Sequence, residues 1–287
     1  MVNATHDTPA APAARSGSPT GGRGLARLAC GLAERQPALA CFGTVMMASA
    51  VPVLILSAID DREVLGVNVW IKPAKFFVSI GIYALTLAWA FAFLSPERRT
   101  GRSARYVVAA TIGAGTLEQA IITVRAALGQ RSHFNVGTPG DAAWYSLMGL
   151  SAVLLVSTAA VMGVMVWRSD VLTGARRIGW AAGLFIAGIL GGASGAIMSA
   201  RDGHWVGSAS SDRNGLPFLG WSTSVGDLRI AHFLGLHAMF VLPLVGWVAY
   251  RRWGNRPAAM RVTSGVTLLW VGVVAAAFAN AMAGNPL

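Results

Sequence analysis

The sequence predicts an all-α integral membrane protein, a bundle of about seven transmembrane helices. Of the 287 residues, 54% are hydrophobic and only 12% are charged, roughly half the charged share of an average soluble domain. The apolar residues gather into seven runs, each near the ~20 residues that a helix needs to cross a ~30 Å hydrocarbon core. In lipid such runs must be helical, because a helix satisfies its own backbone hydrogen bonds.

The composition divides the chain into three parts. Residues 1–24 are rich in Ala, Pro, Ser, Thr and Gly and lack an apolar run, which predicts a disordered cytoplasmic tail. Residues 25–37 place leucines on one helical face, which predicts a short interfacial helix. Residues 38–287 form the predicted transmembrane domain, with spans at 38–59, 73–94, 107–128, 142–167, 178–199, 229–250 and 264–284.

The distribution of charge predicts the orientation of these spans. If the amino terminus is cytoplasmic, the cytoplasmic segments hold 15 basic and four acidic residues, which accounts for the whole net charge of +11. The positive-inside rule therefore predicts a cytoplasmic amino terminus and an external carboxyl terminus. Because the charge follows the topology, we expect the lipid bilayer as partner and no nucleic acid. Arginine outnumbers lysine by 21 to 2, which is typical of GC-rich bacterial genomes and indicates a bacterial inner membrane.

Ionisable residues in the outer half of the membrane are the most informative feature. Glu118 and Arg125 are seven apart in the third span and so lie on one helical face. In the sixth span, His237 matches the depth of Glu118, at ~12 and ~15 Å, and His232 matches that of Arg125, both at ~4 Å. Such residues normally face the bundle interior or a wet cavity. We therefore expect Glu118 and His237 to transfer protons in a polar cavity that opens outward between spans three and six and that spans two and five help to line. The alternative is that Glu118 only makes an interhelical hydrogen bond.

Four histidines fall on the outer side of the membrane: His133, His204, His232 and His237. Histidines from facing helices commonly bind b-type haem. His232 and His237 diverge by about 140° on one helix, and no established metal-binding spacing occurs in the sequence. One hypothesis is that these histidines bind haem b or a transition metal. The other is that neutral histidines line a polar pocket.

Other side chains are candidates for holding a small-molecule ligand. Lys75 lies just inside the second span, and Arg125 lies near the outer end of the third. Asp227 and Arg229 flank the start of the sixth span, where an ion pair or a helix-start acid also explains them. The loop 201–227 mixes small polar residues with aromatic ones. That composition is typical of the interfacial belt or of a lid that covers a cavity.

Two segments carry a resemblance to known proteins: WSTSVGDLRIAHFLGLHA at residues 221–238 and GQRSHFN at residues 129–135. They resemble a family of bacterial polytopic inner-membrane proteins to which no function is assigned, and the resemblance spans most of the helical region. It brings no activity, cofactor or site residue to this chain.

Three functions fit these observations. The favoured one is a periplasm-facing redox or cofactor-binding protein, in which Glu118 moves protons and one or more histidines bind metal or haem. In the second, a proton-coupled transporter or receptor, Arg125, Arg229 and the histidines hold a small polar or anionic ligand. The third is a structural accessory subunit of a membrane complex. No sequence motif decides whether the chain is an enzyme.

Overall fold

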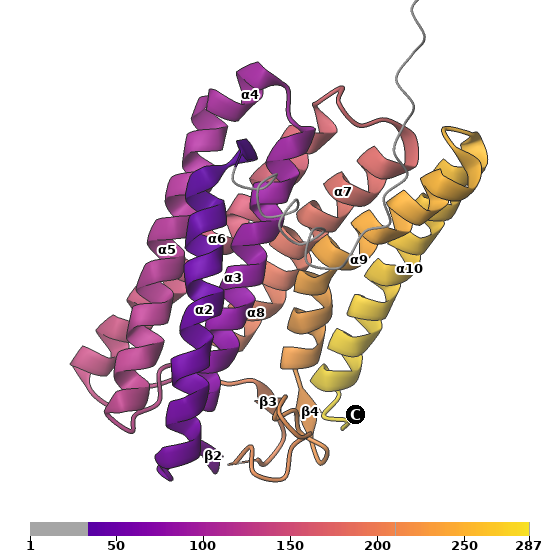
Figure 1. The fold of residues 1–287 in the computed structure, drawn as a ribbon. Coiled ribbons are helices and arrows are strands. Elements are labelled where there is room, and N and C mark those ends of the chain that lie inside the picture. Colours follow the sequence, from indigo (N-terminus) through magenta and orange to yellow (C-terminus); the bar gives the residue numbers. More distant parts are fainter. Residues whose placement is uncertain (1–33, 210, 287) are drawn as a thin grey trace, which may run out of the picture.

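The computed structural model describes residues 34–209 and 211–286, which form a helical bundle (Figure 1). Within these residues seven helices are long and apolar enough to cross a membrane. The prediction of a helical bundle with about seven long apolar spans is therefore confirmed, and these helices are compatible with a multi-pass membrane protein. The predicted tail at 1–24 and most of the predicted interfacial helix at 25–37 lie outside the described residues.

The seven spans follow the predicted apolar runs within a few residues, except that the last begins seven residues earlier. Five of them are single helices: α2 (Pro37–Ile59), α5 (Arg102–Ala127), α6 (Pro139–Trp167), α9 (Arg229–Trp253) and α10 (Pro257–Met282). The second is α3 (Ile71–Ala90) with the 3-10 turn η1 (Phe91–Phe93), and the fifth is α7 (Gly174–Ile186), the π-helical η2 (Ala187–Gly191) and α8 (Gly192–Ala200). A short helix, α4 (Pro96–Thr100), precedes α5. Proline opens α2, α4, α6 and α10, because it presets the helical φ and the first N–H needs no helical partner.

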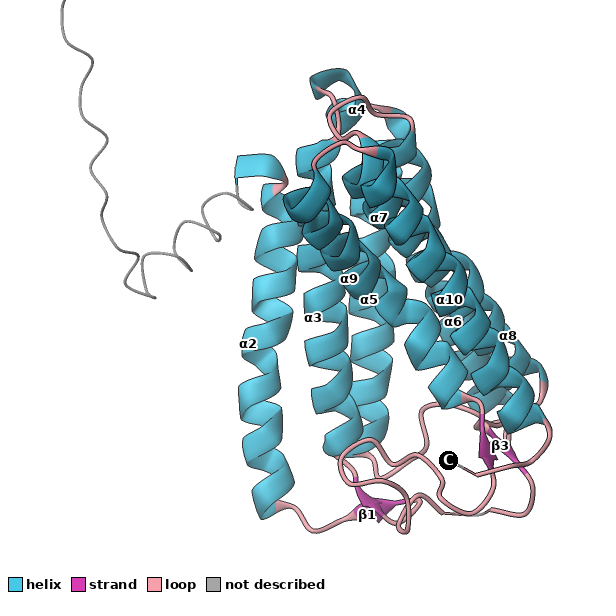
Figure 2. Cartoon of the chain, turned by 90° about the vertical axis from the view of Figure 1, so that its right-hand side faces the viewer, coloured by secondary structure: helices cyan, strands magenta, loops and turns pink. Residues whose placement is uncertain are grey.

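The two ends of the bundle differ in chemistry. The loop end carries the connections 60–70, 128–138 and 201–228 together with the carboxyl terminus (Figure 2). Two small antiparallel sheets lie there, β1 (Glu63–Val64) with β2 (Val67–Asn68) and β3 (Trp205–Val206) with β4 (Gly226–Asp227). The opposite end, called the arginine-rich end below, carries Arg98, Arg99, Arg102, Arg105, Arg168, Arg176, Arg177, Arg251, Arg252, Arg256 and Arg261.

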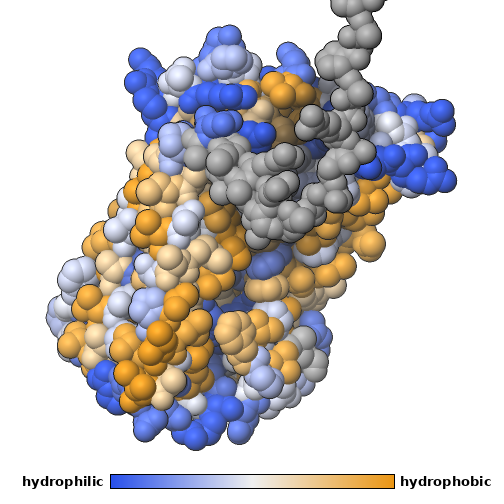
Figure 3. Space-filling model, viewed as in Figure 1, coloured by the Kyte–Doolittle hydropathy of each residue, from blue (hydrophilic) through white to orange (hydrophobic). Residues whose placement is uncertain are grey.

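The helices form two halves that α6 joins. Helices α2, α3 and α5 pack together, α7 to α10 pack together, and α6 packs against both groups. A continuous core, which includes Leu87 of α3, Met162 of α6 and Leu184 of α7, closes the halves on each other. Towards the loop end the surface is hollowed between α3 and α9, with hydrophilic residues inside the hollow (Figure 3). This α3–α9 cleft lies between the second and sixth spans. The predicted cavity lies between the third and sixth spans, with the second helping to line it.

Glycines allow the backbones of α7 and α9 to approach closely. A Cβ added at Gly183 of α7 would lie 2.6 Å from the Ala238 carbonyl oxygen of α9. At Gly246 of α9, an added Cβ would lie 2.5 Å from the Ala175 carbonyl oxygen of α7. Both neighbours are backbone atoms, so a side chain at either position would push the two helices apart.

We expect Gly183→Ala to destabilise the protein by about 1–3 kcal/mol, because overpacking moves the backbone. The measurement is thermal unfolding in detergent, followed by tryptophan fluorescence. Gly265→Ala in α10 is the matched control, because no atom lies within 4 Å of its added Cβ. There alanine should leave the midpoint unchanged or raise it slightly. Equal midpoints for the two variants would contradict the close packing of α7 on α9.

Candidate functional site

The polar residues at the loop end form two clusters. One lies among α3, α5, α6 and the 128–138 connection, and the other lies in the 201–228 connection and at the start of α9. The Glu118 cluster comprises Lys72, Glu118, His133 and Ser151. The Arg229 cluster comprises His204, Asp212, Asp227 and Arg229. Together they contain five of the predicted site residues and add Lys72, Ser151 and Asp212, which the sequence prediction missed.

Glu118 projects from α5 into the bundle and is only 4% exposed. Ser151 Oγ of α6 donates a hydrogen bond to Glu118 Oε2 over 2.7 Å. Nε2 of His133, in the connection between α5 and α6, lies 3.4 Å from Glu118 Oε1. This separation is slightly longer than the about 2.6–3.2 Å of a direct proton transfer between a carboxyl group and an imidazole. The acid that the sequence predicts as a proton carrier therefore has a titratable partner, although this partner is His133.

His133 is partly buried beside Phe76, with 5.7 Å between the ring centroids. Burial lowers the pKa of His133 to about 4, the positive charge of Lys72 acts in the same direction, and the hydrogen bond to Glu118 opposes both. The imidazole is therefore neutral at pH 7. Its Nδ1 lies 3.2 Å from Ser132 Oγ, so the serine hydroxyl can donate to Nδ1 while Nε2–H faces the carboxylate.

Lys72 and Lys75 are the only lysines of the chain and lie in the first turns of α3. Lys75 Nζ donates to the Phe218 carbonyl over 3.2 Å. Lys72 Nζ lies 6.0 Å from the centre of the Phe76 ring, a weak cation–π distance. Among residues 34–209 and 211–286, no carboxylate oxygen lies within 4 Å of either ammonium group.

The two arginines of the site, unlike the two lysines, form ion pairs with aspartates. Arg125 Nη1 lies 2.6 Å from Asp141 Oδ1. Arg229 Nη2 lies 2.6 Å from Asp227 Oδ2 and 2.8 Å from Asp212 Oδ1. The charges of the predicted ligand-binding residues Arg125, Asp227 and Arg229 are thus neutralised within the protein. For Asp227 and Arg229, these contacts fit the alternative drawn from the sequence, in which the two residues form an ion pair at the start of the sixth span.

The 201–228 connection, called the lid below, is fastened to α9 by the Arg229 cluster. Arg229 Nη2 donates to the Gly220 carbonyl over 2.6 Å. The buried Asp227 carboxylate accepts the backbone N–H of Ser222 over 2.9 Å. His204 Nε2 lies 3.5 Å from Asp212 Oδ1, and burial lowers the pKa of His204. The start of α9 and the lid are therefore held as one unit.

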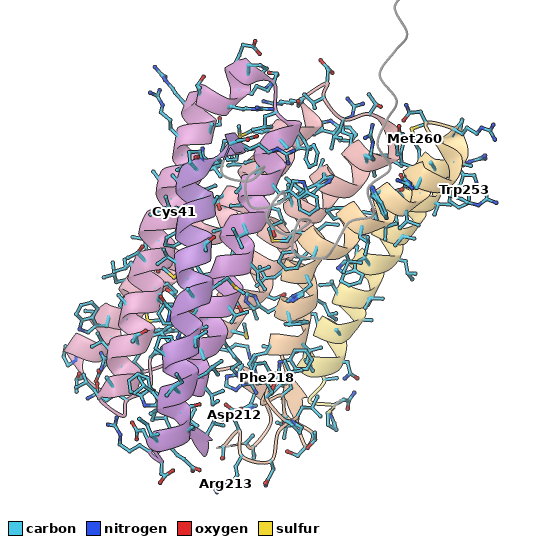
Figure 4. All side chains as sticks on the ribbon, in the orientation of Figure 1. Cys41, Asp212, Arg213, Phe218, Trp253 and Met260 are labelled. Carbon is cyan, nitrogen blue, oxygen red and sulfur yellow. The ribbon has the colours of Figure 1, made fainter. Side chains whose placement is uncertain are left out.

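The lid is also fastened to the opposite half of the bundle. The Asp212 backbone N–H donates to the Leu65 carbonyl over 3.0 Å, and Arg213 pairs with Glu63 of β1. Figure 4 labels Asp212, Arg213 and Phe218 in this connection, at the loop end of the bundle. Since Lys75 holds Phe218 from α3, the lid crosses the cleft from one half to the other.

Backbone strain is confined to the same end. In the described ranges, four non-glycine residues have positive φ, and all lie in loop-end connections: Leu65, Phe134, Asp202 and Phe218. Such a conformation costs of order 1–3 kcal/mol at a residue with a Cβ, and it commonly collects at functional sites. Phe134 directly follows His133, and Phe218 is the residue whose carbonyl receives Lys75.

The structure pairs the two α9 histidines differently from the depth prediction. His237 Nδ1 lies 2.8 Å from the Phe233 carbonyl oxygen of its own helix, and its ring stacks on Phe233 at 3.6 Å. His232 Nδ1 lies 2.7 Å from the Gly191 carbonyl oxygen. No hydrogen bond or ion pair joins either histidine to Glu118 or Arg125 in the described part of the chain. Depth sets only height in the membrane, and α5 and α9 belong to different halves of the bundle.

The four predicted histidine ligands do not converge on one point. Within the described ranges, no group of three or more His, Cys, Asp and Glu side chains could hold a metal ion. His133 and His204 each face a carboxylate, whereas the Nδ1 atoms of His232 and His237 face backbone carbonyls. The binding of haem b or a transition metal by these residues stays a prediction.

Lowering the pH from about 6.5 to about 4 should destabilise the protein. An unfolded histidine takes up a proton near pH 6.5, whereas folded His133 resists protonation until about pH 4. In this window the unfolded state binds more protons, so stability falls with the pH, by at most about 1.4 kcal/mol per pH unit for one histidine. Thermal unfolding in detergent across this range measures the slope.

His133→Gln should flatten this slope, because the group that resists protonation is then absent. His204→Gln is the matched comparison, because burial lowers the pKa of His204 as well and it contributes in the same direction. If the midpoint of the His133→Gln protein follows the wild-type curve throughout the window, the neutral state assigned to His133 is wrong.

Comparison with known proteins found no relative of this chain. No family model, curated protein or solved structure matches the chain.

Proposed function

We propose that this chain is a multi-pass protein of the bacterial inner membrane that binds a small anionic ligand in the α3–α9 cleft. Transport or reception of that ligand would be coupled to protons. The observation that carries the proposal is the contrast between lysines and arginines. Lys72 and Lys75 have no carboxylate within 4 Å among the described residues, whereas Arg125 and Arg229 are paired with aspartates. A cation within membrane depth is costly without a counter-charge, and a bound anion would supply one.

Glu118 supplies the coupling to protons in this proposal. It lies within electrostatic range of Lys72. When Glu118 is ionised, it offsets part of the positive charge that the two lysines present. When Glu118 takes up a proton, the cleft becomes more positive and the anion is held more tightly. Anion binding should therefore be stronger in the protonated state of Glu118 than in its ionised state.

A second candidate, the redox or cofactor-binding function, is favoured by one observation. His232 and His237 each place Nδ1 against a backbone carbonyl. If Nδ1 carries the proton, Nε2 keeps its lone pair, which is the arrangement of most metal-bound histidines. A haem or metal ion would then need further ligands beyond this helix.

The proposed location includes an orientation, with the arginine-rich end in the cytoplasm and the lid in the periplasm. Alkaline phosphatase fused after Leu287 should be active, and green fluorescent protein fused there should be dark. Fusions after Arg256, in the connection between α9 and α10, should give the reverse pair of signals. The opposite pattern at both positions would invert the proposed orientation.

Anion binding should appear as thermal stabilisation of the purified protein by inorganic phosphate, succinate or octanoate. A ligand at 100 times its Kd stabilises by about 2.7 kcal/mol. The double variant Lys72→Met, Lys75→Met should lose this effect, while Arg131→Met, which removes an exposed loop cation, should keep it. Glu118→Gln should bind the anion with a weaker dependence on pH.

Two results would count against the anion site. One is the absence of stabilisation by all of these anions and by anionic lipid. The other is an equal response of the wild-type protein and the double lysine variant. A Soret band or stoichiometric metal in the purified protein would favour the second candidate, and a colourless, metal-free protein would count against it.

A further inference from the structure

We propose that the ligand of the α3–α9 cleft is a lipid with an anionic headgroup, which enters sideways from the bilayer. Its headgroup would bind Lys72 and Lys75, and its acyl chain would lie between α3 and α9. This inference rests on the proposed anion site and adds the source and the shape of the ligand.

The cleft opens at the side of the bundle. Figure 3 views the molecule across its helices, and the hollow between α3 and α9 faces the viewer. A molecule that diffuses in the plane of a bilayer would meet this opening directly. The end of the bundle is crossed by the lid, whose residues 218–220 receive hydrogen bonds from Lys75 and Arg229. The opening therefore favours a ligand from the membrane over one from water.

The α3 wall combines the two cations with a stripe of uncharged side chains. The stripe alternates hydroxyl and apolar residues at helical spacing along the face of the two lysines: Ser79, Ile82, Thr86 and Trp89. Ile82 is 39% exposed and Trp89 is 46% exposed, although both lie on a span that is otherwise well packed. At 1.5 Å per residue, the stripe extends ~21 Å beyond Lys75, which exceeds half of a ~30 Å hydrocarbon core.

The α9 wall presents a row of rings. Gly235, Ala238 and Leu242 are buried, and the first two pack against the fifth span. Phe233 and His237 lie about half a turn away, on the open side of the helix. Phe233, His237 and Phe240 contact one another in sequence, with centroid distances of 3.6 and 5.3 Å. Trp221 of the lid meets Phe233 at 5.1 Å, so the row continues to the headgroup end.

A soluble anion would use only the lysines, whereas an anionic lipid uses the whole cleft. The positive charge lies at the loop end, where headgroups lie in a membrane, and the uncharged stripe of α3 and the rings of α9 run from it towards the membrane centre. This order of charge and apolar surface along α3 and α9 is the order of headgroup and chain in a lipid. Charge complementarity then selects anionic headgroups over zwitterionic ones.

The test reconstitutes the full chain in nanodiscs of phosphatidylcholine with increasing fractions of phosphatidylglycerol. We expect the unfolding midpoint to rise with the fraction of phosphatidylglycerol, above its value in pure phosphatidylcholine. Ile82→Trp, which fills the stripe but leaves both lysines, should raise the lipid fraction needed for half of the effect by about tenfold, or about 1.4 kcal/mol. Leu268→Trp is the matched control, because Leu268 is 73% exposed on α10.

The outcomes separate this inference from the proposed function. If inorganic phosphate stabilises the protein through the lysines and phosphatidylglycerol adds nothing, the anion site stands and the lipid inference falls. If the Ile82→Trp and Leu268→Trp proteins respond alike to phosphatidylglycerol, the acyl chain does not lie along α3, and the lipid inference also falls. If no anion acts in either setting, both fall together.

Discussion

A charged side chain in an apolar solvent needs a partner, because an unpaired ion at membrane depth costs at least a few kcal/mol. This requirement orders the loop end of the bundle. Arg125 has Asp141, Arg229 has two aspartates, and the Glu118 carboxylate has a serine hydroxyl and an imidazole. These contacts join α5 to α6 and to the connection between them, and they join the lid to α9. The two lysines differ from the arginines because neither has a carboxylate within 4 Å among the described residues, and the proposed function follows from that difference.

The two halves of the bundle explain why a cleft exists at all. Helix α6 packs against both halves, and a continuous core joins them. Glycines draw α7 and α9 together, which leaves α9 separated from α3 towards the loop end. The lid then spans the gap with polar contacts on both sides. Its strained residues, Phe218 among them, indicate that tertiary contacts override local backbone preference there.

Protonation and ligand binding are joined in this arrangement through local electrostatics. The Glu118 carboxylate, the His133 imidazole and the Lys72 ammonium lie within range of one another. Any change in the charge of one alters the affinity of the others for protons or anions. The arginines take no part in this exchange because a guanidinium does not lose its proton in proteins. Lysines and a carboxyl–imidazole pair are thus the natural groups for a site that responds to pH.

The sequence by itself determined the membrane fold. Hydropathy runs predict spans because a helix is the only way for an isolated segment to satisfy its backbone in lipid, and this constraint is local. The sequence also pointed to Glu118, since an acid among apolar residues stands out in one dimension. Partner identity was decided only by the tertiary structure. Depth along a helix can be counted from the sequence, but the direction of a side chain depends on how the helices pack. The partners of Glu118 and Arg125 therefore came from the connections and from α6. Lys72 was recognisable only once the structure showed no carboxylate within 4 Å of it among the described residues.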